Sequence, residues 1–468
     1  MNPSNNTSPA PDASLADVFF KPLFEAAHQS ASQRPCFSLS DDSWLKLGVQ
    51  RVLGNHPSGR SLLQSTLSLF TTAPSHQLWF ESLKSSRRLR FCRDTAMRVF
   101  HHGIKAFNND DVLRHLPALR DFEVLAGDGH FISHACHDPR QPSSDGGARH
   151  YPTGHFYLLD LRRHLLRHLM LGDQLQRKKE HDIRAIKRAG AQSLREGIPT
   201  GRKTLLIWDP AGIDFKLWHE YKAQHGIYFI SRSKENLAFM RCGQRPWDRA
   251  DSLNHGIESD QQVGSGTQGY LLRKVTYTDP QSGRTYEFIT NEMTLPPGLI
   301  ALLYRMRWDI EKVFDELKNK LQQTKAWASS ATAKQIQAQF ICLIHNLMRL
   351  MQRELAAEGI EDRIEIKRRA ESRGVKPPRQ KRRPQDHVPD KSRNQRKPAL
   401  RTRVGVREDK DKVAQQAAQN HWPQNLRRWL LRLTQRGVKF IRWLRTQLLF
   451  NRPWSQACEQ LRQIYQRG

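Results

Sequence analysis

The stretch DFEVLAGDGHFISHA, residues 121–135, decides the fold of this 468-residue chain. It is a short apolar run bounded by Asp and Gly residues, which is typical of a buried β-strand. Three further runs of this kind follow it: GHFYLLDLRRHLL (154–166), KTLLIWDP (203–210) and IYFISRS (227–233). Two helical patterns lie among them: KKEHDIRAIKRAG (178–190) and DFKLWHEYKAQHG (214–226). Because strands and helices alternate, the sequence predicts an α/β core.

Segments on both sides of this core read differently. The pattern from Ala16 to Phe107 is helical, as it is in QIQAQFICLIHNLMRLMQREL (335–355) and again over the last 50 or so residues. Within the core, residues 236–297 have strand pairs and loop composition, which predicts a β-rich insertion. Residues 367–412 contain 18 Lys or Arg, 6 Asp or Glu and 5 Pro, which predicts an extended basic linker.

The net charge points to a polyanionic partner. The chain carries 76 Lys and Arg against 46 Asp and Glu, a formal net charge of +30. Neutralising phosphates with such a surplus releases condensed counterions, so nucleic acid is the expected partner. We expect no membrane association, because we find no apolar run of about 18 residues, no secretory signal and no lipidation motif. The six cysteines form no C-x-x-C pair, which favours a reducing, cytoplasmic setting.

A second stretch, LYRMRWDIEKVFDELKNKL at 303–321, reads as one amphipathic helix. At about 100° per residue, Tyr304, Arg307, Glu311 and Lys318 fall at roughly 0°, 300°, 340° and 320°. They form one polar stripe beside an apolar face. Tyr304 and Lys318 would lie about 21 Å apart, so the stripe suits a linear ligand such as a nucleic-acid strand. A solvated helix face with pairs four residues apart is the alternative.

Three carboxylates occupy positions that suit metal-dependent phosphoryl transfer. That chemistry needs oxygen ligands from separate chain segments around two divalent ions. We expect Asp128 to end the strand VLAGD and Asp209 to end LLIWD, and Glu311 lies on the helix beyond the insertion. Any one of them alone would be read as a turn or surface residue.

Together these residues resemble a known family. Tyr304, Arg307, Glu311 and Lys318 match the Y-(2)-R-(3)-E-(6)-K signature of bacterial insertion-sequence transposases of the DDE type, the IS-four-like family. AGDGHFISH, YFISRSKEN and FITN also look like the family, and the resemblance covers residues 115–350. It implies an RNase H-like catalytic core with a β-rich insertion, flanked by N-terminal and C-terminal helical regions.

The resemblance also implies roles for residues. Asp128, Asp209 and Glu311 would be the catalytic triad and would bind Mg²⁺, two ions with Mn²⁺ able to substitute. Tyr304, Arg307 and Lys318 would hold phosphates of the DNA. One departure leaves an alternative open, since many relatives carry Arg-Gly after the second Asp. This chain has DPAGIDF there, so Asp214 competes with Asp209.

Other residues have weaker claims. Trp308 would either stack on a displaced base or cap the core. Trp247 is a weaker candidate for the same role, and Arg232 and Lys234 are candidate phosphate contacts. The histidines near Asp128 lack a zinc-ligand spacing. GSGTQG at 264–269 lacks the strand and helix that a dinucleotide site requires.

The expected activity is therefore that of a DNA transposase, which binds the terminal inverted repeats of its element, cleaves its ends and joins them to target DNA, acting as at least a dimer. The alternatives are a transposase-derived DNA-binding protein that no longer cuts and a structure-selective nuclease of the same fold. The division that we expect is this: a disordered N-terminus (1–15), an N-terminal helical DNA-binding region (16–114), the catalytic domain (115–350), a helix end with the basic linker (351–412), and a C-terminal helical region (413–468).

Overall fold

The computed structural model describes most of the chain outside the predicted linker. The described residues are 13–34, 38–54, 56, 58–65, 74–108, 111, 113–142, 146–173, 180–234, 237–265, 269–280, 282–360 and 438–466. The predicted basic linker at 367–412 lies outside them, as do residues 1–12 of the predicted disordered N-terminus and residues 413–437 of the predicted C-terminal region.

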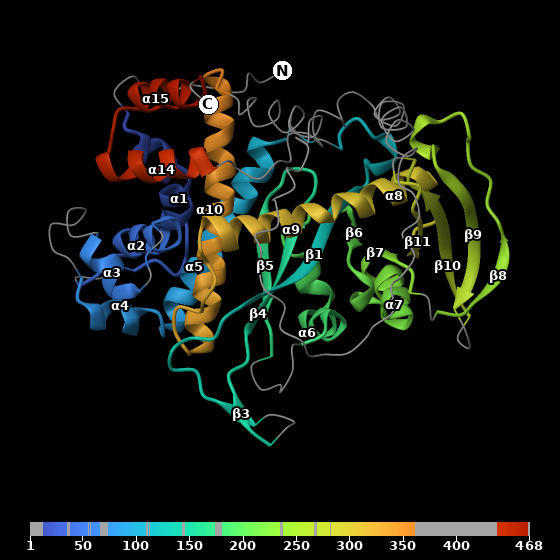
Figure 1. Cartoon of the computed structure of the whole chain (residues 1–468), viewed down its shortest axis with the longest axis horizontal. Coiled ribbons are helices and arrows are strands. Elements are labelled where there is room, and N and C mark those ends of the chain that lie inside the picture. The colour runs from blue at the N-terminus through green and yellow to red at the C-terminus, as the bar shows by residue number, and fades with distance from the viewer. Residues whose placement is uncertain are drawn as a thin grey trace, which may run out of the picture.

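One mixed sheet runs through the described part of the molecule (Figure 1). Its nine strands have the order β5-β4-β1-β6-β7-β11-β10-β9-β8. The strands are β1 (Phe122–Ile132), β4 (Thr153–Asp160), β5 (Leu166–Leu171), β6 (Lys203–Ile207), β7 (Ile227–Arg232), β8 (Phe239–Gln244), β9 (Ile257–Ser265), β10 (Tyr270–Thr278) and β11 (Thr285–Thr290). A short hairpin, β2 (Gln141–Pro142) and β3 (Ala148–Arg149), stands apart. The expectation of an α/β fold is confirmed.

The centre of the sheet is parallel and buried. β1 pairs in parallel with β6, and β6 with β7. The crossovers between them contain α6 (Asp182–Arg195) and α7 (Phe215–His225). Strands covered on both faces read as continuous apolar runs, which is why KTLLI and IYFIS are so hydrophobic.

β1 is longer than the sequence predicts. Asp128 does not end the strand, because β4 pairs with β1 in antiparallel fashion from Leu125 to Ile132. Asp128 lies opposite Tyr157 in that pairing, and His130 lies opposite His155. Gly129, which would have begun a turn after Asp128, lies within the strand. Asp209 does follow the end of its strand, β6, and caps the short 3₁₀ helix η3 (Pro210–Gly212).

The segment predicted as a β-rich insertion extends this same sheet. β11 pairs with β7, and β10, β9 and β8 follow outward in antiparallel order. A buried ion pair braces these outer strands: Arg273 on β10 donates to Asp260 on β9 at 2.8 and 2.7 Å. A second short 3₁₀ helix, η4 (Ser252–Asn254), connects β8 to β9.

Helices gather at the other end of the sheet, beside β5 (Figure 1). They are α1 (Leu15–His28), α2 (Asp41–Leu53), α3 (Gly59–Ser65), α4 (His76–Ser82), α5 (Ser86–Ala106), α10 (Ala331–Ala357), α14 (Val438–Phe450) and α15 (Trp454–Gln466). Between α5 and β1 lies the 3₁₀ helix η2 (Pro117–Leu119). The long helix α10 closes the edge of the sheet, because Asn346 accepts from Leu166 N at 2.8 Å and donates to Leu166 O at 2.9 Å.

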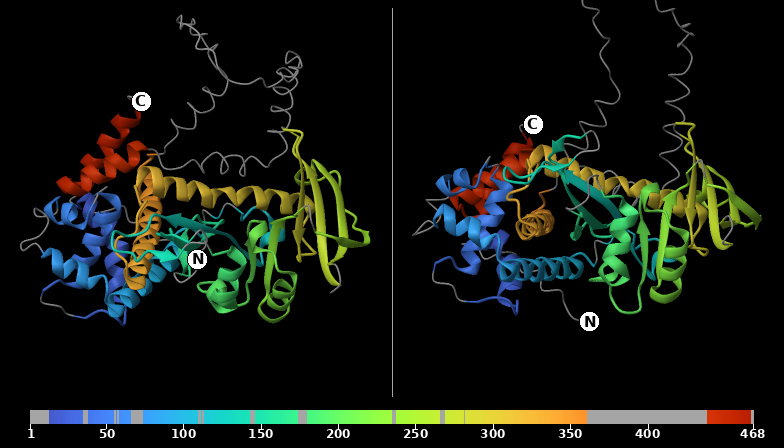
Figure 2. Two further views of the ribbon diagram at one scale, coloured as in Figure 1. Left: turned by 60° about the horizontal axis from the view of Figure 1, so that its bottom comes forward. Right: turned by 90° about the horizontal axis from the view of Figure 1, so that it is seen from below.

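The stretch 303–321 forms three consecutive segments instead of one regular α-helix. α8 (Pro297–Met306) and α9 (Trp308–Asp315) are followed by a π-helical turn, η6 (Glu316–Lys320). Together they make a nearly straight rod across the sheet (Figure 2). The π-helical turn changes the angle per residue, so Lys318 does not keep the direction that a 100° wheel assigns to it.

None of the helices within the described residues combines the length and apolar character that crossing a membrane would need.

We predict that Gly298→Ala is strongly destabilising. Gly298 lies in the first turn of α8, and a Cβ added there would be 1.7 Å from the backbone oxygen of Leu253. Backbone atoms cannot move aside as a flexible side chain can, so we expect a loss of about 2 kcal/mol or more in the free energy of unfolding. Urea unfolding measures the change. Gly243→Ala is the matched control, because nothing lies within 4 Å of its added Cβ. Equal losses in the two variants would contradict the prediction.

Candidate active site

The register of β1 and β6 places Asp128 beside Asp209. Ala126 and Ile207 are the last paired residues of these parallel strands. Each Asp comes two residues later in its own strand direction, so both side chains lie on the same face of the sheet. Neighbouring strands lie about 4.8 Å apart. The sheet therefore brings together two carboxylates that are 81 residues apart in the sequence.

Arg307 connects these carboxylates to the third one. Its guanidinium lies 3.5 Å from Asp128 Oδ2 and donates to Glu311 Oε1 at 2.8 Å. Arg307 follows α8 directly and Glu311 lies on α9, so the rod presents both side chains to β1. Only about a tenth of the Arg307 side chain is exposed. The geometry thus places Asp128, Arg307 and Glu311 in one cluster.

Burial leaves Asp128 short of compensating charge. Burial raises the pKa of Asp128 to about 7. Attraction to Arg307 and a hydrogen bond from Gly129 N at 2.8 Å oppose this increase, while repulsion from Asp182 and Asp209 adds to it. The repulsion from Asp209 is consistent with the neighbouring positions that the strand register gives the two aspartates. A buried carboxylate with a raised pKa would be stabilised in its charged form by a further cation.

Tyr304 and Arg232 border the same cluster. Burial raises the pKa of the Tyr304 phenol, and Arg307 and Arg232 counteract the shift. The Tyr304 ring contacts Phe288 on β11, with ring centroids 5.1 Å apart, and the Arg307 guanidinium lies 5.6 Å from its centroid. Arg232 is exposed at the end of β7. These cations and the phenol thus approach the carboxylates from the side of the outer strands.

Lys318 is exposed on the π-helical turn at the other side. Burial lowers the pKa of His130 to about 4, and the positive charge of Lys318 contributes to this shift. Lys318 is therefore close enough to His130 for their charges to interact. His130 is two residues beyond Asp128 on the same face of β1 and stacks on Phe314 of α9 at 4.8 Å. Sequence reasoning passed over His130 as an ordinary strand residue. The structure places it between the carboxylates and Lys318.

Asp214, the competitor of Asp209, already has a structural role. Its carboxylate caps α7 by accepting from Leu217 N at 3.1 Å and pairs with Lys187 Nζ at 2.5 Å. Partial burial opposes the effect, but the hydrogen bonds from Lys187 and Leu217 lower the pKa of Asp214. A carboxylate engaged in this way is a poorer candidate for the cluster than Asp209.

A fourth carboxylate, Asp182, was missed from the sequence. It is the first residue of α6, and its Oδ2 accepts from Trp208 Nε1 at 2.6 Å. Burial raises the pKa of Asp182 to about 6, and Asp209 contributes to the increase. The sequence shows only an acidic residue in the first turn of a helix, which is a common stabilising position. Nothing in that pattern indicates that it accepts a hydrogen bond from Trp208, the residue before Asp209.

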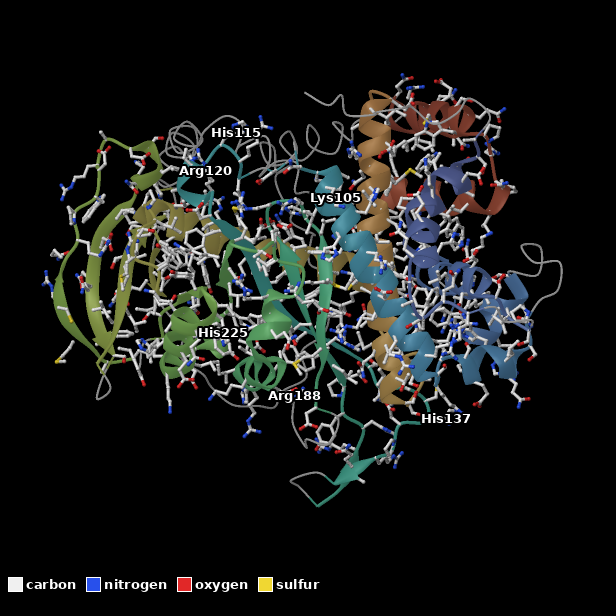
Figure 3. The ribbon with its side chains drawn as sticks, turned by 180° about the vertical axis from the view of Figure 1, so that it is seen from behind. Lys105, His115, Arg120, His137, Arg188 and His225 are labelled. Atoms are coloured by element: carbon white, nitrogen blue, oxygen red, sulfur yellow. The ribbon has the colours of Figure 1, made fainter. Side chains whose placement is uncertain are left out.

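The remaining candidates lie further out. Trp308 is 57% exposed, so it does not cap the core. Trp247 lies beneath Arg249, whose guanidinium is 5.3 Å from its ring centroid. Lys234 is exposed beyond β7. Exposed cations also occur on other elements, and Figure 3 labels Lys105 on α5 and Arg188 on α6.

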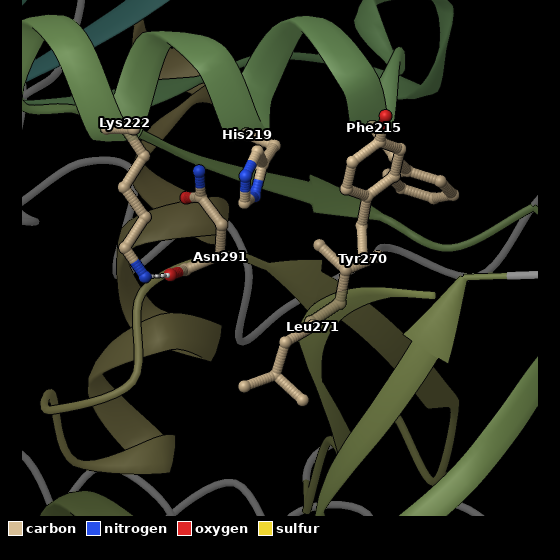
Figure 4. A pocket seen from close by; sticks show the side chains of 8 residues that line it. Phe215, His219, Lys222, Tyr270, Leu271 and Asn291 are labelled. Atoms are coloured by element: carbon tan, nitrogen blue, oxygen red, sulfur yellow. Dashed lines mark hydrogen bonds between the residues drawn. The ribbon is translucent and has the colours of Figure 1, made fainter. Parts of the chain in front are cut away.

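A separate pocket lies between α7 and β10 (Figure 4). Its volume is about 260 Å³, and its walls include Phe215, His219 and Tyr270. The Lys222 ammonium at its edge already donates to the backbone oxygen of Asn291 at 2.7 Å. None of the described residues that line this pocket is a carboxylate.

The carboxylate cluster is not closed around a metal in this arrangement. Within the described ranges, no three His, Cys, Asp or Glu side chains converge closely enough to hold a metal ion. The positive charge between Asp128 and Glu311 is supplied by Arg307. The donor chemistry nevertheless fits a divalent cation, because the side chains around Arg307 offer carboxylate oxygens and one of them is undercompensated.

Comparisons with known proteins relate the core of the chain to transposases. Residues 119–347 match the family described as "Transposase DDE domain". This segment extends from the residues just before β1 into α10 and contains Asp128, Asp209 and Glu311. The α/β core of the chain is thus similar to the DDE domain of transposases.

Two individual proteins are also similar. "Putative transposase y4zB" of Sinorhizobium fredii (strain NBRC 101917 / NGR234) is 26% identical over 141 residues, which make up 29% of this chain. The match spans 39% of that relative, or about two fifths of its length. Among solved structures, the cryo-EM structure of the piggyBac transposase synaptic complex with hairpin DNA has a TM-score of 0.37 and 11% identity, covering 95% of this chain and 86% of that one.

We predict that Asp128→Asn stabilises the metal-free protein at alkaline pH. In the unfolded chain this carboxyl ionises near pH 4, whereas burial raises its pKa to about 7 in the folded state. Between those values the folded state holds a proton that the unfolded state has released, so wild-type stability falls as the pH rises from about 4 to 7. The variant avoids this loss. Urea unfolding in chelator should show it about 1 to 3 kcal/mol more stable at pH 8 and nearly equal near pH 4.

Asp214→Asn is the control for that measurement. The pKa of Asp214 is lowered, so its ionised form favours folding above its unfolded pKa, and the variant should be less stable than wild type at pH 8. A difference between Asp128→Asn and wild type that is the same at both pH values would contradict the assignment of the raised pKa.

Proposed function

We propose that this protein is a DDE transposase, which cleaves DNA at the ends of its element and joins them to target DNA. The observation that carries the proposal is the arrangement of three carboxylates: Asp128 on β1 and Asp209 just beyond β6 occupy matching register positions, and Arg307 links Asp128 to Glu311. The similarity of residues 119–347 to transposase DDE domains supports it.

We further propose that the core is RNase H-like, of the IS-four-like type. The strand order β5-β4-β1-β6-β7 supports this, with three antiparallel strands followed by two parallel ones. The crossover helices α6 and α7 and the acidic residues at the centre are consistent with that fold. The insertion between Asp209 and Glu311 would then be β8 to β11, and Tyr304, Arg307, Glu311 and Lys318 would be the family signature.

Asp128, Asp209 and Glu311 are the residues that would hold the divalent cations, Mg²⁺ or Mn²⁺. Bound ions of this kind supply Lewis-acid stabilisation of a phosphoryl group and lower the pKa of water. Arg307 alone does not keep the pKa of Asp128 at its usual value. A divalent cation would carry more positive charge and would stabilise the ionised carboxylate further.

The cationic side chains would position the DNA strand. Arg307 and Arg232 lie on the side of β7 and β11, and Lys318 lies beyond His130. A strand crossing the carboxylates would therefore meet positive charge before and after the reacting phosphate. Such contacts fix register and orientation without reading sequence. Tyr304, packed between Phe288 and Arg307, would donate its hydroxyl to a phosphate oxygen.

The exposed aromatic and flanking residues complete the DNA contacts. Trp308, 57% exposed, would stack on an unpaired base, and Trp247 and Lys234 would contact the DNA further out. We also propose that the protein acts as a dimer on double-stranded DNA, since two element ends require two active sites. The N-terminal helical region would contribute to DNA binding, and the C-terminal helices would contribute the contact between copies.

The decisive variant is Glu311→Gln. It keeps the hydrogen bond with Arg307 but removes the charge, so we expect cleavage to fall by at least about a hundredfold while DNA binding changes by less than about threefold. Purified protein with Mg²⁺ or Mn²⁺ is incubated with labelled duplexes taken from the inverted repeats flanking the gene. Cleavage and strand joining are read on sequencing gels, and binding is read by mobility shift.

Asp209→Asn and Asp214→Asn form a matched pair in the same assay. Asp209→Asn should lose cleavage, whereas Asp214→Asn should stay within about threefold of wild type, because Asn still caps a helix. Wild-type protein that binds the ends but neither cuts nor joins them would instead indicate a transposase-derived binding protein. Cutting without joining, and without preference for the ends, would indicate a structure-selective nuclease.

A further inference from the structure

The side chain next to Asp209 is anchored in an unusual way. Trp208 is 1% exposed, and its indole N–H donates to Asp182 Oδ2 at 2.6 Å. This indole packs in the apolar layer between the sheet and helices α6 and α7. The ring has one polar atom, and that atom is directed at a carboxylate on the neighbouring helix. The bond therefore fixes the rotation of the ring as well as its position.

Two glycines lie against this ring, where a side chain would clash with it. A Cβ added to Gly127 would lie 2.0 Å from the six-membered ring of Trp208, and one added to Gly212 would lie 2.9 Å from its five-membered ring. Gly127 immediately precedes Asp128, and Gly212 closes the turn that Asp209 begins. The indole is thus held against the backbone that carries both aspartates.

Strand geometry connects the position of the Trp208 ring to the positions of the Asp128 and Asp209 carboxylates. Side chains alternate between faces, so Trp208 and Gly127 share one face, and Asp209 and Asp128 share the other. The ring that lies against Gly127 spans from β6 to β1 at the point where the carboxylates leave the sheet. Rotation or displacement of the ring would shift the backbone of residue 209 relative to that of residue 128.

We propose that Asp182 and Trp208 are positioning residues, which set the distance and direction of the Asp128 and Asp209 carboxylates for a divalent cation. This inference rests on the proposed function, since it assigns the pair to the same site. Asp182 acts through Trp208 and is not itself a ligand. The known consequence of loosening such a supporting contact in metal proteins is a tenfold to hundredfold loss of metal affinity.

The test compares three variants with a matched control. Trp208→Phe keeps the ring but removes the donor, Asp182→Leu removes the acceptor, and Asp182→Asn keeps an oxygen that can accept from the indole. The control is Trp44→Phe. Trp44 is also fully buried and donates to a side-chain oxygen, Ser82 Oγ, at 2.9 Å, but it lies among the N-terminal helices. Mn²⁺ affinity of the full chain without DNA is measured by electron paramagnetic resonance, alongside cleavage, DNA binding and thermal stability.

We expect Trp208→Phe and Asp182→Leu to weaken Mn²⁺ binding and slow cleavage by about tenfold or more, with DNA affinity within about twofold. Asp182→Asn should stay within about threefold of wild type in both readouts. Trp44→Phe should lose thermal stability to a similar degree as Trp208→Phe and yet bind Mn²⁺ as wild type does.

Three results would overturn the inference. Equal Mn²⁺ affinity in Trp208→Phe and Trp44→Phe would show that the hydrogen bond between Trp208 and Asp182 is an ordinary core contact. Asp182→Asn as defective as Asp182→Leu would show that the charge of Asp182 itself is needed, as it is in a ligand, and not its bond to Trp208. Wild-type protein without Mn²⁺ affinity would remove the site itself. If wild type binds Mn²⁺ but cleaves no DNA, the proposed function fails while the Mn²⁺ affinities still decide the positioning role.

Discussion

The parallel pairing of β1 with β6 is the constraint on which the candidate site depends. Ala126 lies opposite Ile207, and from that register the side chains of residues 128 and 209 leave the sheet on one face. A slip of one residue would turn one of them to the opposite face. Burial holds β6 between two apolar layers, because Leu205, Leu206 and their neighbours are fully enclosed. The apolar core thus determines where the acidic groups meet.

The charges of the acidic cluster are only partly compensated by the neighbouring cations. Asp128 is partly buried without enough positive charge to keep its pKa at the usual value, and Arg307 is shared between two carboxylates. Under the proposed function, the same guanidinium has two alternative partners, the carboxylates and a phosphate. Cations bound at the carboxylates would free Arg307 for the DNA strand. The net charge of +30 makes a polyanion a favourable partner for those residues that have no acidic neighbour.

The sequence predicts the core elements well because burial and period determine them. The runs KTLLI and IYFIS are strands, and DIRAIKRAG and FKLWHEYKAQH are helices, where their patterns place them. The sequence does not predict features that depend on the pairing of one strand with another. The extension of β1 through Asp128 depends on β4, and no local signal replaces that partner. The division of 303–321 into α8, α9 and a π-helical turn is likewise not visible in its amphipathic pattern. Asp182 reads as an ordinary helix-start residue, because its relation to Trp208 exists only after folding.

The outer strands, which the sequence suggests are an insertion, pack directly against the elements that carry the candidate site. β11 pairs with β7 so that Phe288 lies opposite Arg232, and the Phe288 ring contacts Tyr304 on α8. One side chain of the outer sheet is therefore wedged between a strand end and the helix that carries the cluster. The buried pair Arg273 and Asp260 keeps β10 and β9 in register behind it. Because β11 pairs back onto β7, the β-rich segment after Asp209 ends beside the core strands, and the chain enters α8 with Tyr304 packed against the outer sheet.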